Sequence, residues 1–250
     1  LLMLRPGILL LLFLLSGCDN ATPAKNATSL ALQLQFNGQP LRCDSAMMLS
    51  DKPWQLAQLQ LYLSDFSLNN KPLLLDPTPL HQQPQLALLG TVCNEPANAN
   101  WQLKFTRPLT SGTLAFSLGV PLARNHQDPL QAKPPLNQSD MYWSWQQGYK
   151  YLRLELTGAD SQWALHLGAT GCQSPSPMRP PSSACQQQNR PQIAVAYQSG
   201  QSLSLDLAPL LDGISLSADN HCMADPNRLS CQTLLPRLGI GARPQGWSMQ

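Results

Sequence analysis

Apolar and polar residues alternate along much of this chain with a period of two. Between positions 30 and 36, Leu30, Leu32 and Leu34 fall on one set of alternate positions, and Gln33 and Gln35 fall on the other. This alternation is typical of a β-strand that buries one face. The same pattern predicts further strands at 56–68, 103–105, 112–118, 149–156, 163–167, 193–197 and 202–207.

The spacing of these strands predicts the fold class. Turn residues separate the strands at short intervals, and the 23 prolines argue against long helices. We therefore expect an all-β, β-sandwich-like single domain over residues 30–250, with long loops, stapled by disulfides. The stretches that do not fit strands are a long loop at 121–140, a Ser/Pro-rich excursion at 173–190, a short helix starting at 208–213, and a tail at 219–238.

The first 29 residues have the character of an export signal followed by a tether. Arg5 precedes a run of apolar residues that ends at Leu15, which is shorter than the roughly 20 residues of a membrane-spanning helix. Leu-Ser-Gly-Cys then resembles the lipobox of bacterial lipoproteins. We expect a lipoprotein signal peptide at 1–17, lipidation of Cys18, and a lipid-anchored tether at 18–29. The alternative is an ordinary secretory signal with a chance cysteine.

This interpretation predicts the location of the protein. A lipidated Cys18 would anchor it to a membrane on the periplasmic side of the cell envelope. In lipoproteins of the enteric type, an aspartate directly after the cysteine implies retention at the inner membrane, and Asp19 occupies that position.

Export also allows disulfides to form. Of the seven cysteines, six remain once Cys18 is set aside. Short-range closure favours Cys172–Cys185 and Cys222–Cys231, which leaves Cys43–Cys93, although sequence alone leaves other pairings open. A zinc site is the rival interpretation, and the lack of a tight C-x-x-C pair argues against it.

Charge and motifs narrow the function classes. The net charge is +2, only 12% of residues are charged, and no basic patch is visible, so we expect no nucleic-acid partner. The sequence holds no H-E-x-x-H motif, no phosphate loop and no recognisable Ser-His-Asp arrangement. Hydrolysis is therefore a weak interpretation. A copper redox enzyme is a further alternative, but too few ligand-type residues are visible to favour it, so we do not expect an enzyme.

The segment from 136 to 153 is unusually aromatic. Met141, Trp143 and Trp145 follow one another at period two, so on an extended segment they would share one face. That face could be a wall of the core or a surface on which a ligand stacks. His126 lies in the preceding loop and His166 on a strand. A strand histidine is most often a hydrogen-bonded core residue, but two histidines near a methionine would suit Cu(I).

A series of motifs, in order along nearly the whole chain, carries a family resemblance. They include Ser-Leu-Gly-Val-Pro at 117–121, Asn-His at 125–126, Pro-Pro-Leu-Asn at 134–137, Met-Tyr-Trp-Ser-Trp at 141–145, Gly-Tyr-Lys-Tyr at 148–151 and His-Leu-Gly-Ala-Thr-Gly-Cys at 166–172. Together they resemble the MbnP family of copper-binding proteins, also called metallo-mystery pair four-Cys motif proteins.

The resemblance implies a function and a partner. Members of the family are exported β-rich proteins that bind copper in its acquisition or homeostasis. They pair with a di-haem cytochrome c peroxidase-like protein, which oxidises a tryptophan of the copper protein to kynurenine. Carried over to this sequence, Trp143 is the first choice for that tryptophan and Trp145 the second. His126 and His166 become candidate copper ligands, and Met141 a further soft donor for which packing is the role we expect.

A second hypothesis needs no metal. In it, the chain is a β-sandwich lipoprotein that binds a sugar or peptide on a surface lined by Trp143 and Trp145. The two hypotheses differ in what a Trp143→Phe change would do, because only the first makes copper binding depend on that side chain.

Overall fold

The computed structural model describes residues 27–250 of the chain. The expected signal peptide (1–17), the lipidation site Cys18 and most of the tether (18–29) lie outside the described residues, so these assignments stay predictions. Across residues 27–250, no helix combines the length and the apolar character that a membrane crossing requires.

Two sheets form the described part of the chain, and they do not close into a barrel. The smaller sheet is built around a parallel pair, because β1 and β14 run in the same direction. Its strands are β15 (Trp247–Met249), β14 (Leu203–Asp206), β1 (Ser29–Phe36) and β2 (Gln39–Pro40), with β8 (Gln102–Lys104) also paired to β1.

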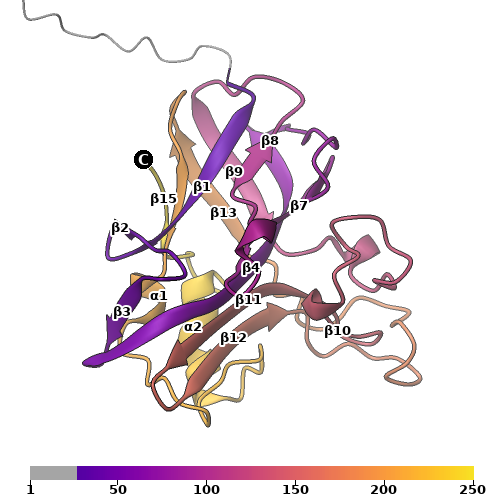
Figure 1. Cartoon of the computed structure of the whole chain (residues 1–250). Coiled ribbons are helices and arrows are strands. Elements are labelled where there is room, and N and C mark those ends of the chain that lie inside the picture. Colours follow the sequence, from indigo (N-terminus) through magenta and orange to yellow (C-terminus); the bar gives the residue numbers. More distant parts are fainter. Residues whose placement is uncertain (1–26) are drawn as a thin grey trace, which may run out of the picture.

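The long strand β4 (Lys52–Leu68) is the spine of the larger sheet (Figure 1). It pairs with β7 (Leu86–Val92), and its successive parts pair with β11 (Gly148–Gly158) and β9 (Gly112–Leu118). The other strands of this sheet are β3 (Ala46–Leu49), β5 (Lys71–Pro72), β6 (Gln82–Gln83), β10 (Tyr142–Ser144), β12 (Gln162–Gly168) and β13 (Gln192–Tyr197). The expected all-β, sandwich-like fold is confirmed.

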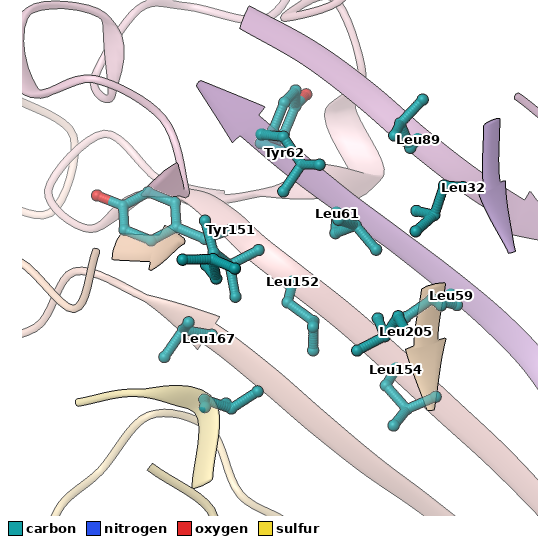
Figure 2. Close-up of a cluster of buried hydrophobic side chains, with 14 of the residues drawn as sticks. Leu32, Leu59, Leu61, Tyr62, Leu89, Tyr151, Leu152, Leu154, Leu167 and Leu205 are labelled. Carbon is teal, nitrogen blue, oxygen red and sulfur yellow. The ribbon is translucent and has the colours of Figure 1, made fainter. Parts of the chain in front are cut away.

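Leucines from both sheets fill the space between them. Figure 2 shows Leu32 and Leu205 of the smaller sheet beside Leu59, Leu61 and Leu154 of the larger one. All five side chains are buried. Removing such side chains from water supplies most of the free energy that favours folding, about 1.5–3 kcal/mol for each leucine.

The alternation in the sequence located eight of these strands but missed β7 and the short strands β2, β3, β5, β6, β10 and β15. In β7 nearly every residue is buried, because its sequence, Leu-Ala-Leu-Leu-Gly-Thr-Val, lies against β4 in the interior of the sheet. A strand that is buried on both faces shows no polar–apolar alternation, so the period-two pattern could not reveal it.

The helices are short. The helix expected at 208–213 is confirmed as α1 (Ala208–Leu211). The tail at 219–238 holds a helix that the sequence analysis did not predict, α2 (Leu229–Leu238), with Pro236 in its last turn and Gly239 in a left-handed conformation just beyond it. Within residues 27–250 there are also three single turns of 3-10 helix, η1 (Pro96–Asn98), η2 (Leu122–Arg124) and η3 (Ser139–Met141).

The disulfides follow the short-range pairing. They join Cys43 to Cys93, Cys172 to Cys185, and Cys222 to Cys231. The second bridge closes the Ser/Pro-rich excursion, and the third ties the tail to α2.

The register of β11 and β12 separates a core face from a polar face. Leu152 and Leu154 of β11 are buried between the sheets, whereas Arg153 and Glu155 project from the opposite face. Arg153 pairs with His166 of β12 across the strands, which places His166 on the same polar face.

Candidate metal centre

Two long loops meet the short strand β10 at one end of β11 and β12 (Figure 1). The first loop covers residues 119–141 and carries His126, and the second covers residues 169–191 and carries the Cys172–Cys185 disulfide. The loops touch, because the Nε2 atom of His126 lies 3.7 Å from the sulfur of Cys185. The surroundings of β10 therefore combine two loops, 119–141 and 169–191, that are far apart in the sequence.

His166 has one ring nitrogen occupied and one free. Its Nε2 lies 2.9 Å from Oε1 of Glu155, and a carboxylate only accepts hydrogen bonds, so Nε2 carries the proton. Its Nδ1 is buried and has no hydrogen-bond partner. Burial lowers the pKa of His166 below its ordinary value, although the Glu155 bond acts against that shift. The ring is therefore neutral at pH 7 and offers the lone pair of Nδ1.

Glu155 is fixed on both sides. Besides accepting from His166, it accepts from Nε of Arg153 at 2.7 Å and from the Nη2 of the same guanidinium at 3.2 Å. The hydrogen bond from His166 and the adjacent Arg153 lower the pKa of Glu155 to about 2. A carboxylate that stays ionised and bonded in this way fixes both the tautomer and the orientation of the imidazole.

Trp143 lies beside His166. The ring centroids of the two residues are 6.5 Å apart. The six-membered ring of Trp143 also covers Gly168: a Cβ atom at that position would lie 2.4 Å from Cζ3 of Trp143. A glycine two residues after His166 is thus what lets the indole lie against β12.

His126 is held by backbone groups. It follows η2, and its Nδ1 lies 3.1 Å from the carbonyl oxygen of Trp145, to which it must donate. Its Nε2 then presents a lone pair toward Cys185 and, at 3.4 Å, toward the amide nitrogen of Asn125. Burial lowers the pKa of His126, so this ring is also neutral at pH 7.

Asn125 anchors the loop that presents His126. It is fully buried, and both its side-chain oxygen and its backbone oxygen accept from the backbone nitrogen of Tyr149. Gly148 makes room for this contact. Its φ is +81°, and a Cβ there would lie 2.2 Å from the backbone oxygen of Asn125.

The expectation that Met141, Trp143 and Trp145 share one face was wrong. Met141 ends η3 and is fully buried in the core, Trp143 lies against β12, and Trp145 packs edge-on against Tyr142 at 6.3 Å. The pairing of β10 with β11 shifts register between Tyr142 and Ser144, and such an irregularity ends strict alternation. The burial of Met141 agrees with the packing role expected for it.

One group of three potential metal-ligating residues gathers within the described residues. The ligand atoms of His126, Cys172 and Cys185 all lie within 4.8 Å of one another. Both sulfurs are bonded to each other in a disulfide, so neither is a thiolate ligand in this state.

The residues present suit a soft, low-coordination metal ion. Each of the two neutral imidazoles donates one N–H to a fixed oxygen and keeps a lone pair on its other nitrogen, as metal-ligating histidines do; this nitrogen has no partner in His166, whereas in His126 it contacts the Asn125 amide and Cys185. The segment 166–172 connects them: His166 begins it, Gly168 carries the Trp143 ring, and Cys172 ends it at the disulfide that faces His126. Imidazole nitrogen is a good donor for copper.

Sequence reasoning did not identify Glu155 or Asn125 as part of this arrangement. Glu155 occupies a polar position two residues after Arg153 on a predicted strand, which is the only signal in the sequence. Its relation to His166 depends on the register of β11 against β12, which the sequence alone does not give.

Comparisons with known proteins bear on the family and the fold of the chain. The family model described as MbnP matches residues 25–224. Among solved structures, MbnP from Methylosinus trichosporium superposes with a TM-score of 0.72 at 21% sequence identity, over 89% of this chain and 97% of that one. At that identity the likeness shows a common fold. No curated protein matches the chain.

Proposed function

The chain belongs to the MbnP family, a family of binding proteins, and on that premise we propose that it is an exported copper-binding lipoprotein. Copper, as Cu(I), is bound by His126 and His166 together with a kynurenine formed from Trp143. The modification is made by a di-haem cytochrome c peroxidase-like partner. The protein is the substrate of that enzyme and serves copper acquisition or homeostasis from the periplasmic side of the inner membrane.

The observation that carries this proposal is the free nitrogen of His166. A buried polar atom without a partner costs about 1–3 kcal/mol, so proteins seldom leave one. Here the other nitrogen of the same ring is bonded to an ionised carboxylate, and the unpartnered Nδ1 is buried. A metal ion bound at Nδ1 would satisfy this atom, and the Glu155–His166 pair is the support that such a ligand needs.

The position of Trp143 supports its assignment as the modified residue. An unmodified indole offers only an N–H donor, whereas kynurenine offers an aryl amine and a ketone oxygen. In the proposed conversion the partner enzyme uses two equivalents of peroxide to add two oxygen atoms across the C2–C3 bond of the indole, which breaks that bond. Hydrolysis of the resulting N-formyl group then releases one carbon atom as formate and leaves kynurenine. Trp143 is the tryptophan whose ring lies beside that of His166, so donors created on it arise beside this imidazole.

Bound Cu(I) would supply a soft acceptor for nitrogen donors at low coordination number. The contributions of the chain are to keep both imidazoles neutral through burial and to orient them through Glu155 and the Trp145 carbonyl. The half-buried aromatic side chains around them limit the access of water.

The structure does not favour the metal-free alternative. A surface for stacking a sugar or peptide would need Trp143 and Trp145 side by side, but one packs on Gly168 and the other against Tyr142. No contact between the two indoles supports a common platform.

The test is an intact-mass and peptide-mapping measurement on protein purified from its native host, with copper quantified in the same sample. We expect the mass change of kynurenine on the peptide holding Trp143, with copper near one equivalent. Trp143→Phe should abolish both. Trp101→Phe is the matched control, because Trp101 is also half-buried but lies by β1 and should change neither. An unmodified, copper-free protein from cells that express the partner would refute the proposal.

A further inference from the structure

The Cys172–Cys185 disulfide differs from the other two in its surroundings. Among the described residues, it is the one bridge whose sulfurs form a compact group with a histidine nitrogen, within 4.8 Å. Neither Cys43–Cys93 nor Cys222–Cys231 belongs to such a group. The nitrogen concerned, Nε2 of His126, carries the lone pair of the ring, because Nδ1 donates to the Trp145 carbonyl; besides Cys185 it contacts only the Asn125 amide, at 3.4 Å.

We propose that reduction of this disulfide converts His126, Cys172 and Cys185 into a second, thiolate-rich site for a soft monovalent cation such as Cu(I). Two thiolates and one neutral imidazole are the donors that such an ion prefers. Metal–sulfur bonds of about 2.3 Å and metal–nitrogen bonds of about 2.0 Å place the ligands of one ion within roughly 4 Å of each other. The group is already nearly that compact. This site needs neither His166 nor Trp143, so it goes beyond the function proposed above.

The reduction is an ordinary thiol–disulfide exchange. A thiolate of a dithiol reductant attacks the sulfur of Cys172, which is only partly buried, and forms a mixed disulfide while Cys185 leaves as a thiolate. The second thiol of the reductant then releases Cys172. Two electrons and two protons reach the cysteines, and the reductant becomes a disulfide.

The fold allows the two sulfurs to separate as an ion enters. The intervening residues 173–184 are exposed or half-buried, so Cys172 can move without disturbing the core. Cys185 is 3% exposed and is followed by residues that pair with the chain before Cys172, through Thr170 and Gln187. Cys185 and His126 therefore form the fixed half of the site, and Cys172 the adjustable half.

The reverse of this reaction would close the site. Oxidation of the two thiolates to the disulfide removes two of the three donors of this second site. His126 is then available only to the copper site proposed above, which it shares with His166. Copper at this position would thus be bound more tightly in reducing than in oxidising surroundings.

The experiment compares oxidised and phosphine-reduced mature protein, without oxygen, in competition with a chromophoric Cu(I) chelator. We expect reduction to tighten Cu(I) binding by at least about tenfold. The gain should persist in Trp143→Phe and in His166→Ala, which separates this inference from the proposed function. It should be lost in His126→Ala and kept in the matched control His81→Ala, whose ring bonds instead to the carbonyl of Gln102.

A second measurement needs no cysteine variant and therefore does not depend on how such a variant folds. The reduced protein is alkylated with and without Cu(I), and each cysteine is located by peptide mapping. Cu(I) should protect Cys172 and Cys185 while leaving Cys43 and Cys93 reactive. Equal alkylation of Cys172 and Cys185 with and without Cu(I), or an affinity gain that survives in His126→Ala, would overturn the inference.

Discussion

The two halves of the candidate centre are built in opposite ways. His166 lies on a strand, where paired neighbours fix its position and the ion pair of Glu155 with Arg153 fixes its tautomer. His126 lies in a loop, where one backbone carbonyl fixes its ring and a disulfide closes the other side. Both rings are neutral and keep a lone pair on one nitrogen. The position of His166 depends on charge and sheet register, whereas that of His126 depends on a loop closed by a disulfide.

The difference indicates what each half depends on. The strand half, made of His166, Glu155 and Arg153, should keep its structure when the loops are lost and should change when one of its charges is removed. The loop half, made of His126 and the Cys172–Cys185 disulfide, should keep its structure when charges change and should lose it when the disulfide is removed. Loops that carry functional residues usually need such restraint, because they lack the paired backbone of a sheet.

The largest expected effect comes from a change that disrupts the loop half alone. Replacing both Cys172 and Cys185 by serine should lower the free energy of unfolding by about 3 kcal/mol, as for other loops of this length. The pKa of His126 should rise toward its ordinary value as its surroundings open to water, whereas the pKa of His166 should not change. Urea unfolding gives the first quantity and NMR titration of the imidazoles gives the second.

The Cys43–Cys93 bridge is the control for that experiment. It closes a longer loop, with a sequence separation of 50, so its removal should cost at least as much stability. It should nevertheless leave both histidine titrations unchanged. If the pKa of His166 moved together with that of His126 in the first variant, the two halves would not be independent.

The next largest effect comes from a change that disrupts the strand half. Glu155→Ala should weaken Cu(I) binding by about 10- to 100-fold, because His166 loses the carboxylate that orients it. Glu155→Gln should restore part of the loss, since an amide oxygen can still accept from Nε2. Competition with a Cu(I) chelator measures both variants.

Glu95→Ala is the matched control for Glu155→Ala. Glu95 is also an acidic residue, but it is exposed and accepts only from Asn98 in its own turn. If its removal weakened copper binding as much as the loss of Glu155, the effect would be one of general charge and not of orientation.

Prediction from sequence succeeded where local pattern decides the structure. Alternation of polar and apolar residues predicts strands that bury one face, such as β1 and β12. Short-range closure predicted the disulfide pairing correctly. Prediction from sequence missed two elements that depend on tertiary contacts: β7 is buried on both faces, and the short helix α2 forms although Pro236 lies in its last turn. Helical propensity is a weak guide against such context.

The candidate site shows the same division. Motifs singled out His126, His166 and Trp143, and the structure places Trp143 beside His166. The separation of Trp143 from Trp145 could not be foreseen, because the shift in register of β10 depends on its partner strand. Glu155 was missed for the same reason.

A smaller effect is the loss of stability of the folded protein at low pH. Burial lowers the pKa of both histidines, so the folded protein keeps them neutral while the unfolded chain takes up protons below about pH 6.5. Their contribution to stability is present above that pH and is lost as the pH falls, by at most about 1.4 kcal/mol per pH unit for each proton.

Glu155 adds a second phase at lower pH. Its contribution is present above its unfolded pKa near 4.5 and is lost as the pH falls toward about 2. Urea unfolding of copper-free protein across this range should show both phases. In His166→Gln the upper phase should shrink, and a profile identical to that of the unchanged protein would contradict this assignment.

The smallest expected effect sharpens the comparison most. Trp145 contributes its backbone carbonyl to His126, while its indole packs against Tyr142 and not against either histidine. Trp145→Phe keeps the carbonyl and an aromatic ring, so the free energy of unfolding should change by no more than about 0.5 kcal/mol, as for most substitutions outside the core. Copper content and the modified peptide should stay as they are, in contrast to Trp143→Phe. If Trp145→Phe abolished the modification and Trp143→Phe did not, the oxidised residue would be Trp145, and the copper ligands would centre on the loop half around His126 instead of the strand half around His166.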